Sequence, residues 1–281
     1  MNQPVIGVQQ LAGLIQSARP PVVVDCRFSL ADSAWGQNAY FKDHIPGAFY
    51  AHLDTDLSDK SQGLQGRHPL PSAKQFEGLM NRFGVTSDTL LVAYDEGDLS
   101  FASRLWWLAR YFGHVKVCVL NGGYAAWRAS GLRVDAVVPA PLPDTAKGQS
   151  FVAQPQTQMK LDYADVVNAR SEIQLIDSRD AARYRGELEP IDPVAGHIPG
   201  ASNAPWKDNL QANGLIKSAE ELKAHWESIL QPDRPPVVYC GSGVTACVNL
   251  LSMEVAGIHK VRLYAGSWSE WCADPKRPVE L

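Results

Sequence analysis

The pentapeptide His-Ile-Pro-Gly-Ala occupies residues His44–Ala48 and recurs, letter for letter, at residues His197–Ala201. Before each copy an apolar stretch ends in Asp-x-Arg, and after each copy another apolar stretch ends in Tyr94 or Tyr239. A helical stretch, a further short apolar run, a glycine turn and a pair of aromatic residues then follow in the same order. Landmarks that keep one order and a nearly constant offset predict two copies of a single structural module.

Within each copy, short apolar runs alternate with amphipathic stretches. Residues 99–112 and 244–256 carry apolar side chains at three- and four-residue spacing, which predicts a helix in each. Short buried strands separated by helices are typical of an α/β fold with a mainly parallel sheet flanked by helices. We therefore expect a first module over residues 1–137, a linker rich in Pro, Ala and Gln over 138–158, and a second module over 159–281.

The composition excludes several classes of partner. The chain has 281 residues, 45% of them hydrophobic, and a formal net charge of −4, which gives no electrostatic case for nucleic acid or an anionic membrane. No apolar run approaches the roughly 20 residues that span a bilayer. The first 14 residues lack the basic start and apolar stretch of a signal peptide. We expect a cytoplasmic protein with neither a nucleic-acid nor a membrane partner.

The repeated motifs themselves predict structure more than chemistry. Because Asp-x-Arg and His-Ile-Pro-Gly-Ala occur in both copies, they need not belong to a site that is used once. We expect Asp177 and Arg179 to pair at the end of a strand, and the pentapeptide to fix a turn.

The two copies differ most where their second apolar run ends. Aligning Tyr94 with Tyr239 places Asp95 opposite Cys240, which is followed by a Gly-Ser-Gly loop and a helical stretch. Glycines allow successive main-chain N–H groups to point at an anion, and a helix start adds unpaired N–H groups and a positive dipole end. Such a loop favours the thiolate, which is the nucleophilic form of cysteine. The pattern predicts that Cys240 is a nucleophile held without a metal.

Cys240 is the one cysteine of the sequence that is followed by such a loop. The other four cysteines lie in strand or helical patterns without such a loop. The chain has five widely spread cysteines, an odd number that predicts reduced thiols rather than disulfides: Cys26, Cys118, Cys240, Cys247 and Cys272.

Motifs of other enzyme and metal-binding classes do not match. A phosphatase-like loop needs an arginine six residues after its cysteine, where this chain has Ala246. A Gly-x-Ser-x-Gly elbow, a Walker loop and Cys-x-x-Cys zinc spacing are absent from the sequence.

The heptapeptide Cys240-Gly-Ser-Gly-Val-Thr-Ala resembles the active-site loop of the 3-mercaptopyruvate sulfurtransferases, which belong to the rhodanese superfamily. The resemblance covers essentially the whole chain, including both His-Ile-Pro-Gly motifs, Trp106-Trp107, Gly122-Gly123 and Gly266-Ser267-Trp268. Tandem members of that superfamily pair an inactive N-terminal module with an active C-terminal one. The resemblance therefore implies an α/β fold of two tandem rhodanese-like modules, with the catalytic loop in the second.

The resemblance also implies roles for individual residues. Cys240 would be the nucleophile, and Arg183 would bind the carboxylate of the substrate. A proton relay proposed for the family maps onto Ser242, His68 and Asp54; the last two precede the linker, which implies a site in the cleft between the modules. Members specific for mercaptopyruvate usually carry a second arginine shortly before the second pentapeptide, but residues 189–193 contain none. Main-chain N–H groups for the sulfur would come from Gly241, Gly243, Val244 and Thr245.

The implied activity moves sulfur from 3-mercaptopyruvate through a Cys240 persulfide to a small thiol, reduced thioredoxin or cyanide, and releases pyruvate without a cofactor. Two alternatives stay open. Thiosulfate sulfurtransferases typically carry Cys-Arg-Lys-Gly-Val-Thr, with two cations where this chain has Gly241 and Ser242. A non-catalytic redox or binding module could merely retain the thiol, although a decayed loop should resemble residues 95–99.

Overall fold

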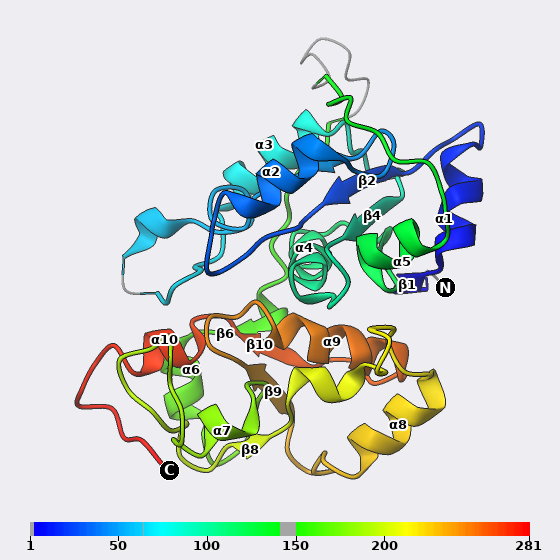
Figure 1. Ribbon diagram of the computed structural model, residues 1–281. Helices are drawn as coiled ribbons and strands as arrows, with labels where there is room; N and C mark the ends of the chain where they lie inside the picture. The colour runs from blue at the N-terminus through cyan, green and yellow to red at the C-terminus, as the bar shows by residue number, and fades with distance from the viewer. Residues whose placement is uncertain (1–2, 64, 141–149) are drawn as a thin grey trace. The chain divides into compact units, whose positions relative to one another are not determined.

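The computed structural model describes residues 3–63, 65–140 and 150–281 (Figure 1). These residues form two compact units. Unit 1 comprises Met1–Asp59, Pro71–Gln156 and Ala212–Leu215, and unit 2 comprises Lys60–Leu70, Thr157–Gln211 and Ile216–Leu281. No helix in the described part of the chain is long and apolar enough to cross a membrane.

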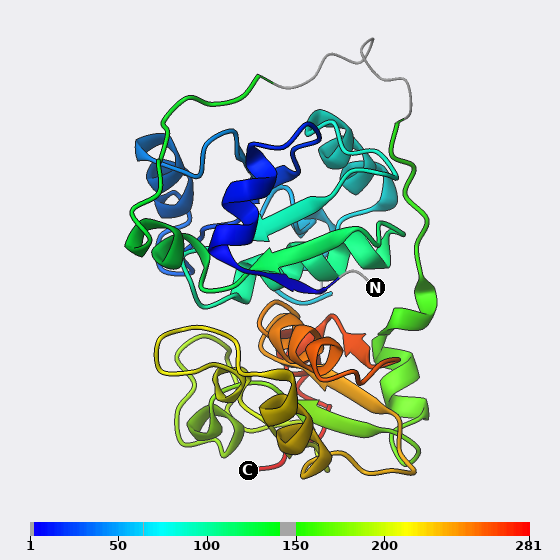
Figure 2. The ribbon, with the colours of Figure 1, turned by 90° about the vertical axis from the view of Figure 1, so that its right-hand side faces the viewer.

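Unit 1 is built on a parallel sheet of five strands (Figure 2). In sheet order these are β1 (Val5–Ile6), β5 (Val117–Leu120), β4 (Leu91–Tyr94), β2 (Val22–Asp25) and β3 (Phe49–Tyr50). Its helices are α1 (Val8–Ile15), α2 (Trp35–Lys42), α3 (Ala73–Arg82), α4 (Ser100–Tyr111) and α5 (Gly123–Ala129). Strand β4 is buried along its whole length, as a central strand of a covered sheet must be.

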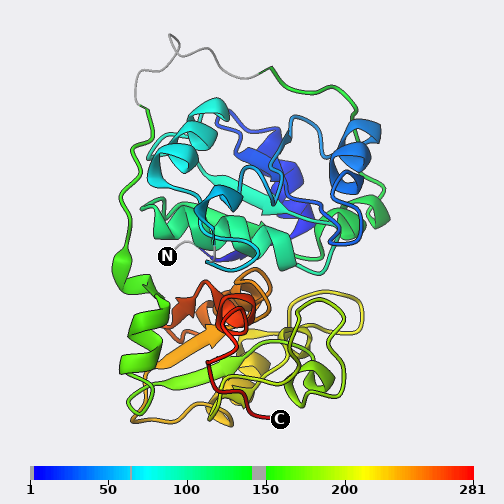
Figure 3. The same ribbon diagram turned by 90° about the vertical axis from the view of Figure 1, so that its left-hand side faces the viewer.

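Unit 2 repeats this topology strand for strand (Figure 3). Its sheet order is β6 (Lys160–Leu161), β10 (Arg262–Tyr264), β9 (Pro236–Tyr239), β7 (Gln174–Asp177) and β8 (Ser202–Asn203), again all parallel. Its helices are α6 (Tyr163–Asn168), α7 (Ala181–Tyr184), α8 (Ala219–Glu227), α9 (Ala246–Val255) and α10 (Ser267–Trp271), and its 3-10 turns are η1 (Lys60–Gln62), η3 (Thr157–Met159) and η4 (Trp206–Asn209). The predicted fold of two parallel sheets flanked by helices is confirmed.

The repeated motifs hold the strand ends in place. In unit 2 the Arg179 side chain donates to Asp177, with 2.6 Å between Nη2 and Oδ2, and both side chains are buried. The main-chain N–H of Ile198, inside the second pentapeptide, donates to the hydroxyl of Tyr239 at the end of β9. Unit 1 repeats the strand-end pair with buried Asp25 and Arg27. The structural interpretation of these motifs is confirmed.

Two short segments belong to a different unit from the residues on either side of them. The sequence placed residues 60–70 in the first module, whereas the structure groups them with unit 2; residues 212–215 group with unit 1. Specific contacts hold the first segment, including a 3.0 Å hydrogen bond from the main-chain N–H of Arg67 to Oγ of Ser269.

The expected linker over residues 138–158 is described only in part, because residues 141–149 lie outside the described residues. Of its later part, residues 150–156 belong to unit 1 and residues 157 and 158 to unit 2. There the main-chain N–H groups of Gln154 and Gln156 donate to the carbonyls of Phe112 and Tyr111. The module boundaries drawn from the sequence stay a prediction.

Candidate active site

Cys240 is the first residue after β9, and its main chain is fixed on both sides. Its N–H donates to Oγ of Ser267 at 3.2 Å, and its carbonyl accepts from the N–H of Trp268 at 3.0 Å. The next carbonyl, that of Gly241, accepts from the N–H of Ser269 at 2.9 Å. Helix α10 therefore holds the start of the loop, and the Cys240 side chain lies in a buried position.

The loop that leads from Cys240 to α9 contains main-chain N–H groups that have no hydrogen-bond acceptor in the described part of the chain. Gly243 has a φ of +74°, and a Cβ there would lie 2.4 Å from the carbonyl oxygen of Ala265, so only glycine fits. Some of the loop's main-chain N–H groups donate none of the hydrogen bonds found among the described residues: those of Gly241, Ser242, Val244 and Thr245. N–H groups at a helix start that lack partners form a site for an anion.

Ser242 and His68 are brought together, although they lie far apart in the sequence. Nδ1 of His68 is 2.7 Å from Oγ of Ser242, and both side chains are buried. Segment 60–70 supplies the histidine to unit 2. A hydroxyl and an imidazole at this distance can pass a proton between them.

Asp54, the third expected member of the relay, belongs to unit 1. In that unit its main-chain N–H donates to Nδ1 of His52 at 3.1 Å. Its role beside His68 stays a prediction.

Arg183, on α7, is engaged by acidic partners. Nε and Nη2 of its guanidinium donate to the two carboxylate oxygens of Glu189, at 3.1 and 2.7 Å, and Nη2 also lies 3.1 Å from Asp192. Burial alone would raise the pKa of Glu189, but the hydrogen bonds from Arg183 and from the main-chain N–H of Asp192 lower it below its usual value. The stretch where a second arginine was expected thus supplies two carboxylates.

Arg67 joins this cluster and was missed by the sequence analysis. Its Nη1 pairs with Oδ1 of Asp192, and its Nη2 lies 2.9 Å from the position that a Cβ of Gly241 would take. The nearest guanidinium nitrogens of Arg183 lie 3.6 Å from the same position. The position of Arg67 directly before His68 was the one signal in the sequence that could have identified it.

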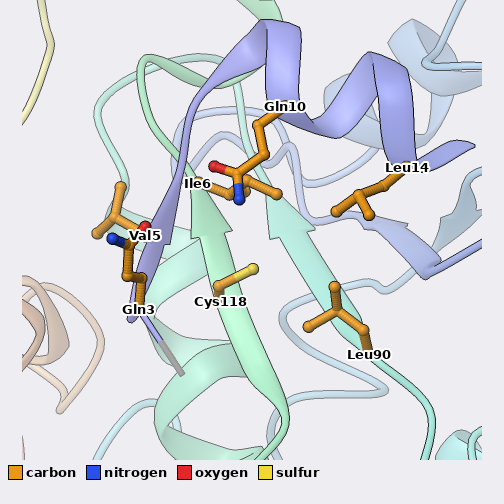
Figure 4. Close-up of a pocket in the computed structure, with 7 residues that line it drawn as sticks. All are labelled: Gln3, Val5, Ile6, Gln10, Leu14, Leu90 and Cys118. Carbon is orange, nitrogen blue, oxygen red and sulfur yellow. The ribbon is translucent and has the colours of Figure 1, made fainter. Parts of the chain in front are cut away.

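Three of the other thiols lie in surroundings that keep them protonated. Burial raises the pKa of Cys118 to about 12 and that of Cys272 to about 11, and it raises the pKa of Cys26 well above its usual value. Figure 4 shows Cys118 with the other residues that line a cavity of about 360 Å³ in unit 1. A cavity beside a protonated thiol offers no nucleophile.

Comparisons with known proteins agree with the repeat. A family model described as a rhodanese-like domain matches residues 8–130 and again 162–274. A Pseudomonas aeruginosa protein named "Probable 3-mercaptopyruvate sulfurtransferase" is 43% identical, over 96% of this chain and 95% of its own length. An Arabidopsis thaliana protein named "Thiosulfate/3-mercaptopyruvate sulfurtransferase 2" is 32% identical, over 99% of this chain and 86% of its own length.

Among solved structures, that of the 3-mercaptopyruvate sulfotransferase SseA from Escherichia coli is similar to this chain with a TM-score of 0.81. The two share 34% identity over 95% of this chain and 99% of that one.

Proposed function

Because the chain belongs to the family of rhodanese-like proteins and carries two copies of the domain, we propose that it is a sulfurtransferase that takes sulfur from 3-mercaptopyruvate. The observation that carries this proposal is Cys240, placed at the start of a loop whose N–H groups are available and whose next two side chains carry no charge. All five cysteines are free thiols, which supports a reducing compartment such as the cytoplasm.

In the first half-reaction, the Cys240 thiolate attacks the sulfur of 3-mercaptopyruvate. An S–S bond forms, the C–S bond breaks, and its electron pair leaves on the methylene carbon as the enolate of pyruvate. The enolate takes up one proton to give pyruvate, and the pair of Ser242 and His68 can deliver that proton. The loop N–H groups stabilise the sulfur anion before and after transfer.

In the second half-reaction, an acceptor attacks the outer sulfur of the persulfide and releases the Cys240 thiolate. A thiolate acceptor leaves as a persulfide, and cyanide leaves as thiocyanate, so no oxidant or cofactor is needed. We propose a small thiol or reduced thioredoxin as the acceptor class. This is covalent catalysis in two steps, and it predicts ping-pong kinetics.

The absence of charged side chains at Gly241 and Ser242 favours 3-mercaptopyruvate over thiosulfate as the donor. Thiosulfate is a compact dianion that is best stabilised by cations beside its sulfur, whereas Gly241 and Ser242 offer none. Mercaptopyruvate carries a single carboxylate away from its sulfur, and a planar guanidinium can bind it with two hydrogen bonds. The arginines beside Gly241 therefore favour mercaptopyruvate.

The test compares pyruvate release from 3-mercaptopyruvate with sulfite release from thiosulfate, at equal concentrations and in one enzyme preparation. We expect mercaptopyruvate to be the faster donor. Replacing Gly241 with Arg and Ser242 with Lys should shift the preference toward thiosulfate. Faster turnover of thiosulfate by the unmodified protein would establish the alternative donor, and no turnover of either would favour a binding module.

A further inference from the structure

We propose that unit 1 binds a small zwitterion of the α-amino acid class, in a pocket at the carboxyl ends of its strands. The pocket has a volume of about 370 Å³ and is lined by α2, by α5 and by residues that follow β2 and β4. This volume lies in the range of about 300–1,000 Å³ that is usual for small-molecule sites. All of its lining residues belong to unit 1, whereas Cys240 belongs to unit 2, so this site does not depend on the proposed function.

The pocket lies at the point of the sheet where the order of the strands reverses. Strand β2 is followed in the chain by β3 on one side of it, whereas β4, on its other side, leads on to β5. Ligands of open α/β sheets bind beyond the carboxyl ends of two such strands, because the loops that leave them in opposite directions leave a crevice. Arg27 and Glu96 each stand two residues after their strand and line the pocket. In unit 2 the Cys240 loop follows β9, the counterpart of β4.

One guanidinium nitrogen of Arg27 has no hydrogen bond at this pocket. The Arg27 side chain is 2% exposed; its Nε and Nη2 donate to the Asp25 carboxylate, and Nη2 also donates to the main-chain carbonyl of Asp43. Nη1 donates no recorded hydrogen bond in the described part of the chain, and carboxylate oxygens of Asp43 and Glu96 lie 3.9 and 3.8 Å from it. Since a buried donor without an acceptor is unfavourable, a ligand oxygen at this nitrogen is favoured.

The corresponding nitrogen in unit 2 has an acceptor. Arg179 repeats Arg27 in the Asp-x-Arg motif, and its Nη1 donates to the carboxylate of Glu189 at 3.2 Å. Among the described residues of unit 1, no carboxylate lies at hydrogen-bonding distance from Nη1 of Arg27. The second copy thus shows which group this position accepts, and in the first copy a ligand carboxylate can take its place.

The pocket also offers a separate cation and a separate anion. The ammonium of Lys42, on α2, is exposed and has no ion pair or hydrogen bond within the described ranges. The Glu96 carboxylate is 55% exposed, and Arg27 at 3.8 Å is its recorded partner. A carboxylate bound by Lys42 and Arg27 together with an ammonium bound by Glu96 satisfies both signs of charge. A simple anion would meet the repulsion of Glu96, so the pattern favours a zwitterion.

The other acid of the pocket is already engaged. One carboxylate oxygen of Asp43 accepts from the hydroxyl of Tyr124 at 2.6 Å, and the other accepts from Nη1 of Arg128 at 3.3 Å. These contacts tie the end of α2 to α5 and fix two walls of the pocket. Asp43 therefore shapes the site, and Glu96 is left to bind the ligand.

One face of α2 supplies an apolar wall beside these charges. Trp35, Asn38 and Lys42 all line the pocket, since positions three and four apart lie on the same face of a helix. Trp35 is 38% exposed, and an indole ring can cover an apolar side chain while its neighbours bind the charged groups. The site is therefore expected to prefer an amino acid with an apolar side chain, and L-leucine is a suitable probe.

The test is titration calorimetry of the full-length protein with L-leucine. We expect one leucine to bind per chain. Isocaproate, which lacks the ammonium, and isopentylamine, which lacks the carboxylate, should bind at least about tenfold more weakly, as the loss of an ionic hydrogen bond implies. No binding of leucine, or binding of isocaproate with equal affinity, would overturn the zwitterion site.

Variants of exposed side chains locate the bound leucine. Lys42→Met and Glu96→Gln should each raise the Kd about tenfold or more, and Lys42→Arg should restore part of the affinity. The matched controls are Lys74→Met and Glu172→Gln, which alter exposed side chains outside the pocket and should leave the Kd unchanged. The unfolding temperature of each variant shows that it is folded. If the Kd is the same in Lys42→Met, in Glu96→Gln and in the unmodified protein, leucine binds elsewhere and the proposal is refuted.

A last variant separates this pocket from the donor site of unit 2. Arg183→Ala should leave the affinity for leucine unchanged, and pyruvate should not compete with leucine. If Arg183→Ala abolishes leucine binding, or if pyruvate displaces leucine, the amino acid occupies the donor site and the pocket in unit 1 is overturned. Pyruvate release from 3-mercaptopyruvate is measured separately, so a failure of the proposed function leaves the result for leucine intact.

Discussion

The loop after β4 and the loop after β9 occupy the same place in two copies of one fold, but they use their main-chain N–H groups in opposite ways. In unit 1 the Asp95 carboxylate accepts four main-chain hydrogen bonds, with N···O distances of 3.0 to 3.1 Å, from the N–H groups of Gly97, Leu99, Phe101 and Ala102. In unit 2 the corresponding position is a thiol, and most of the loop donors have no recorded partner among the described residues. The turn presents N–H groups to an acceptor side chain in the first copy, whereas most of the corresponding groups in the second copy keep no acceptor within the described part of the chain.

The first copy also has no counterparts of two polar side chains that lie around the loop of the second copy. Aligning Asp25 with Asp177 places Ala31 opposite Arg183, so the first copy has no arginine at that position. Gly97 likewise stands opposite Ser242 and has no hydroxyl to offer. The first copy therefore has no counterpart of Cys240, Arg183 or Ser242 at the aligned positions, in accord with the predicted catalytically inactive module.

The largest effect is expected from Cys240→Ser. Sulfur transfer should fall to background, because a serine hydroxyl in the same loop cannot form a persulfide. Cys247→Ser and Cys272→Ser serve as matched controls and should keep most of the activity. Mass spectrometry after treatment with donor should find one added sulfur on the peptide that contains Cys240. Added sulfur on another cysteine, with Cys240→Ser still active, would remove the basis of the comparison.

A smaller loss is expected from Ser242→Ala. Pyruvate formation should slow by roughly 10²-fold, the usual contribution of a positioned proton donor. Thiosulfate is the control donor, since sulfite leaves as a stable anion and needs no proton. Rapid-quench measurement of the first half-reaction with each donor tests this. Equal slowing with both donors would mean that the hydroxyl shapes the loop rather than supplying a proton.

The comparison also predicts a pH effect on unit 1. Burial, and then the neighbouring Asp98, raise the pKa of Asp95 to about 7, against the lowering effect of the main-chain N–H groups. A carboxyl whose pKa is raised by folding stabilises the fold at low pH and loses that contribution as the pH rises from about 4 through about 7. Between pH 5 and pH 8 the free energy of unfolding of the unmodified protein should fall by up to about 3 kcal/mol more than that of the Asp95→Asn variant. Urea unfolding of both proteins at both pH values measures this, and parallel pH slopes would contradict it.

The smallest effect is expected from Cys240→Asp, which gives the second loop the occupant of the first. This variant should be as inactive as Cys240→Ser, yet more stable by about 1–2 kcal/mol at pH 5, which is below the pKa of about 7 of Asp95 in the first loop, because the carboxyl oxygens accept hydrogen bonds from loop N–H groups. Differential scanning calorimetry of the two variants at one pH measures the difference. A variant with Asp that unfolds at or below the temperature of the one with Ser would show that the two loops are not equivalent.

The sequence was informative where contacts are local or repeated. Apolar spacing predicted α4 and α9 to within two residues at each end, since a helical face depends on neighbours three and four positions apart. Cys240 was found by contrast with Asp95, which only an internal repeat makes possible. These features depend on patterns that can be read within one stretch of chain.

Arg67 could not be found in the same way. Its main-chain N–H donates to Ser269, and its guanidinium pairs with Asp192, and both partners lie in the other half of the chain. The absence of an arginine from residues 189–193 was visible in the sequence, but nothing local indicated that residues 60–70 belong to unit 2.

The exchange of residues 60–70 also bears on the history of the chain. A gene that is duplicated and then loses activity in one copy would ordinarily be free to shed that copy. Here the sequence of the first copy supplies Arg67 and His68, which group with the unit that carries the thiol. If the first copy is inactive, as we predict, deleting residues 1–137 would still remove these two side chains from unit 2. We therefore expect selection on the second copy to preserve the first.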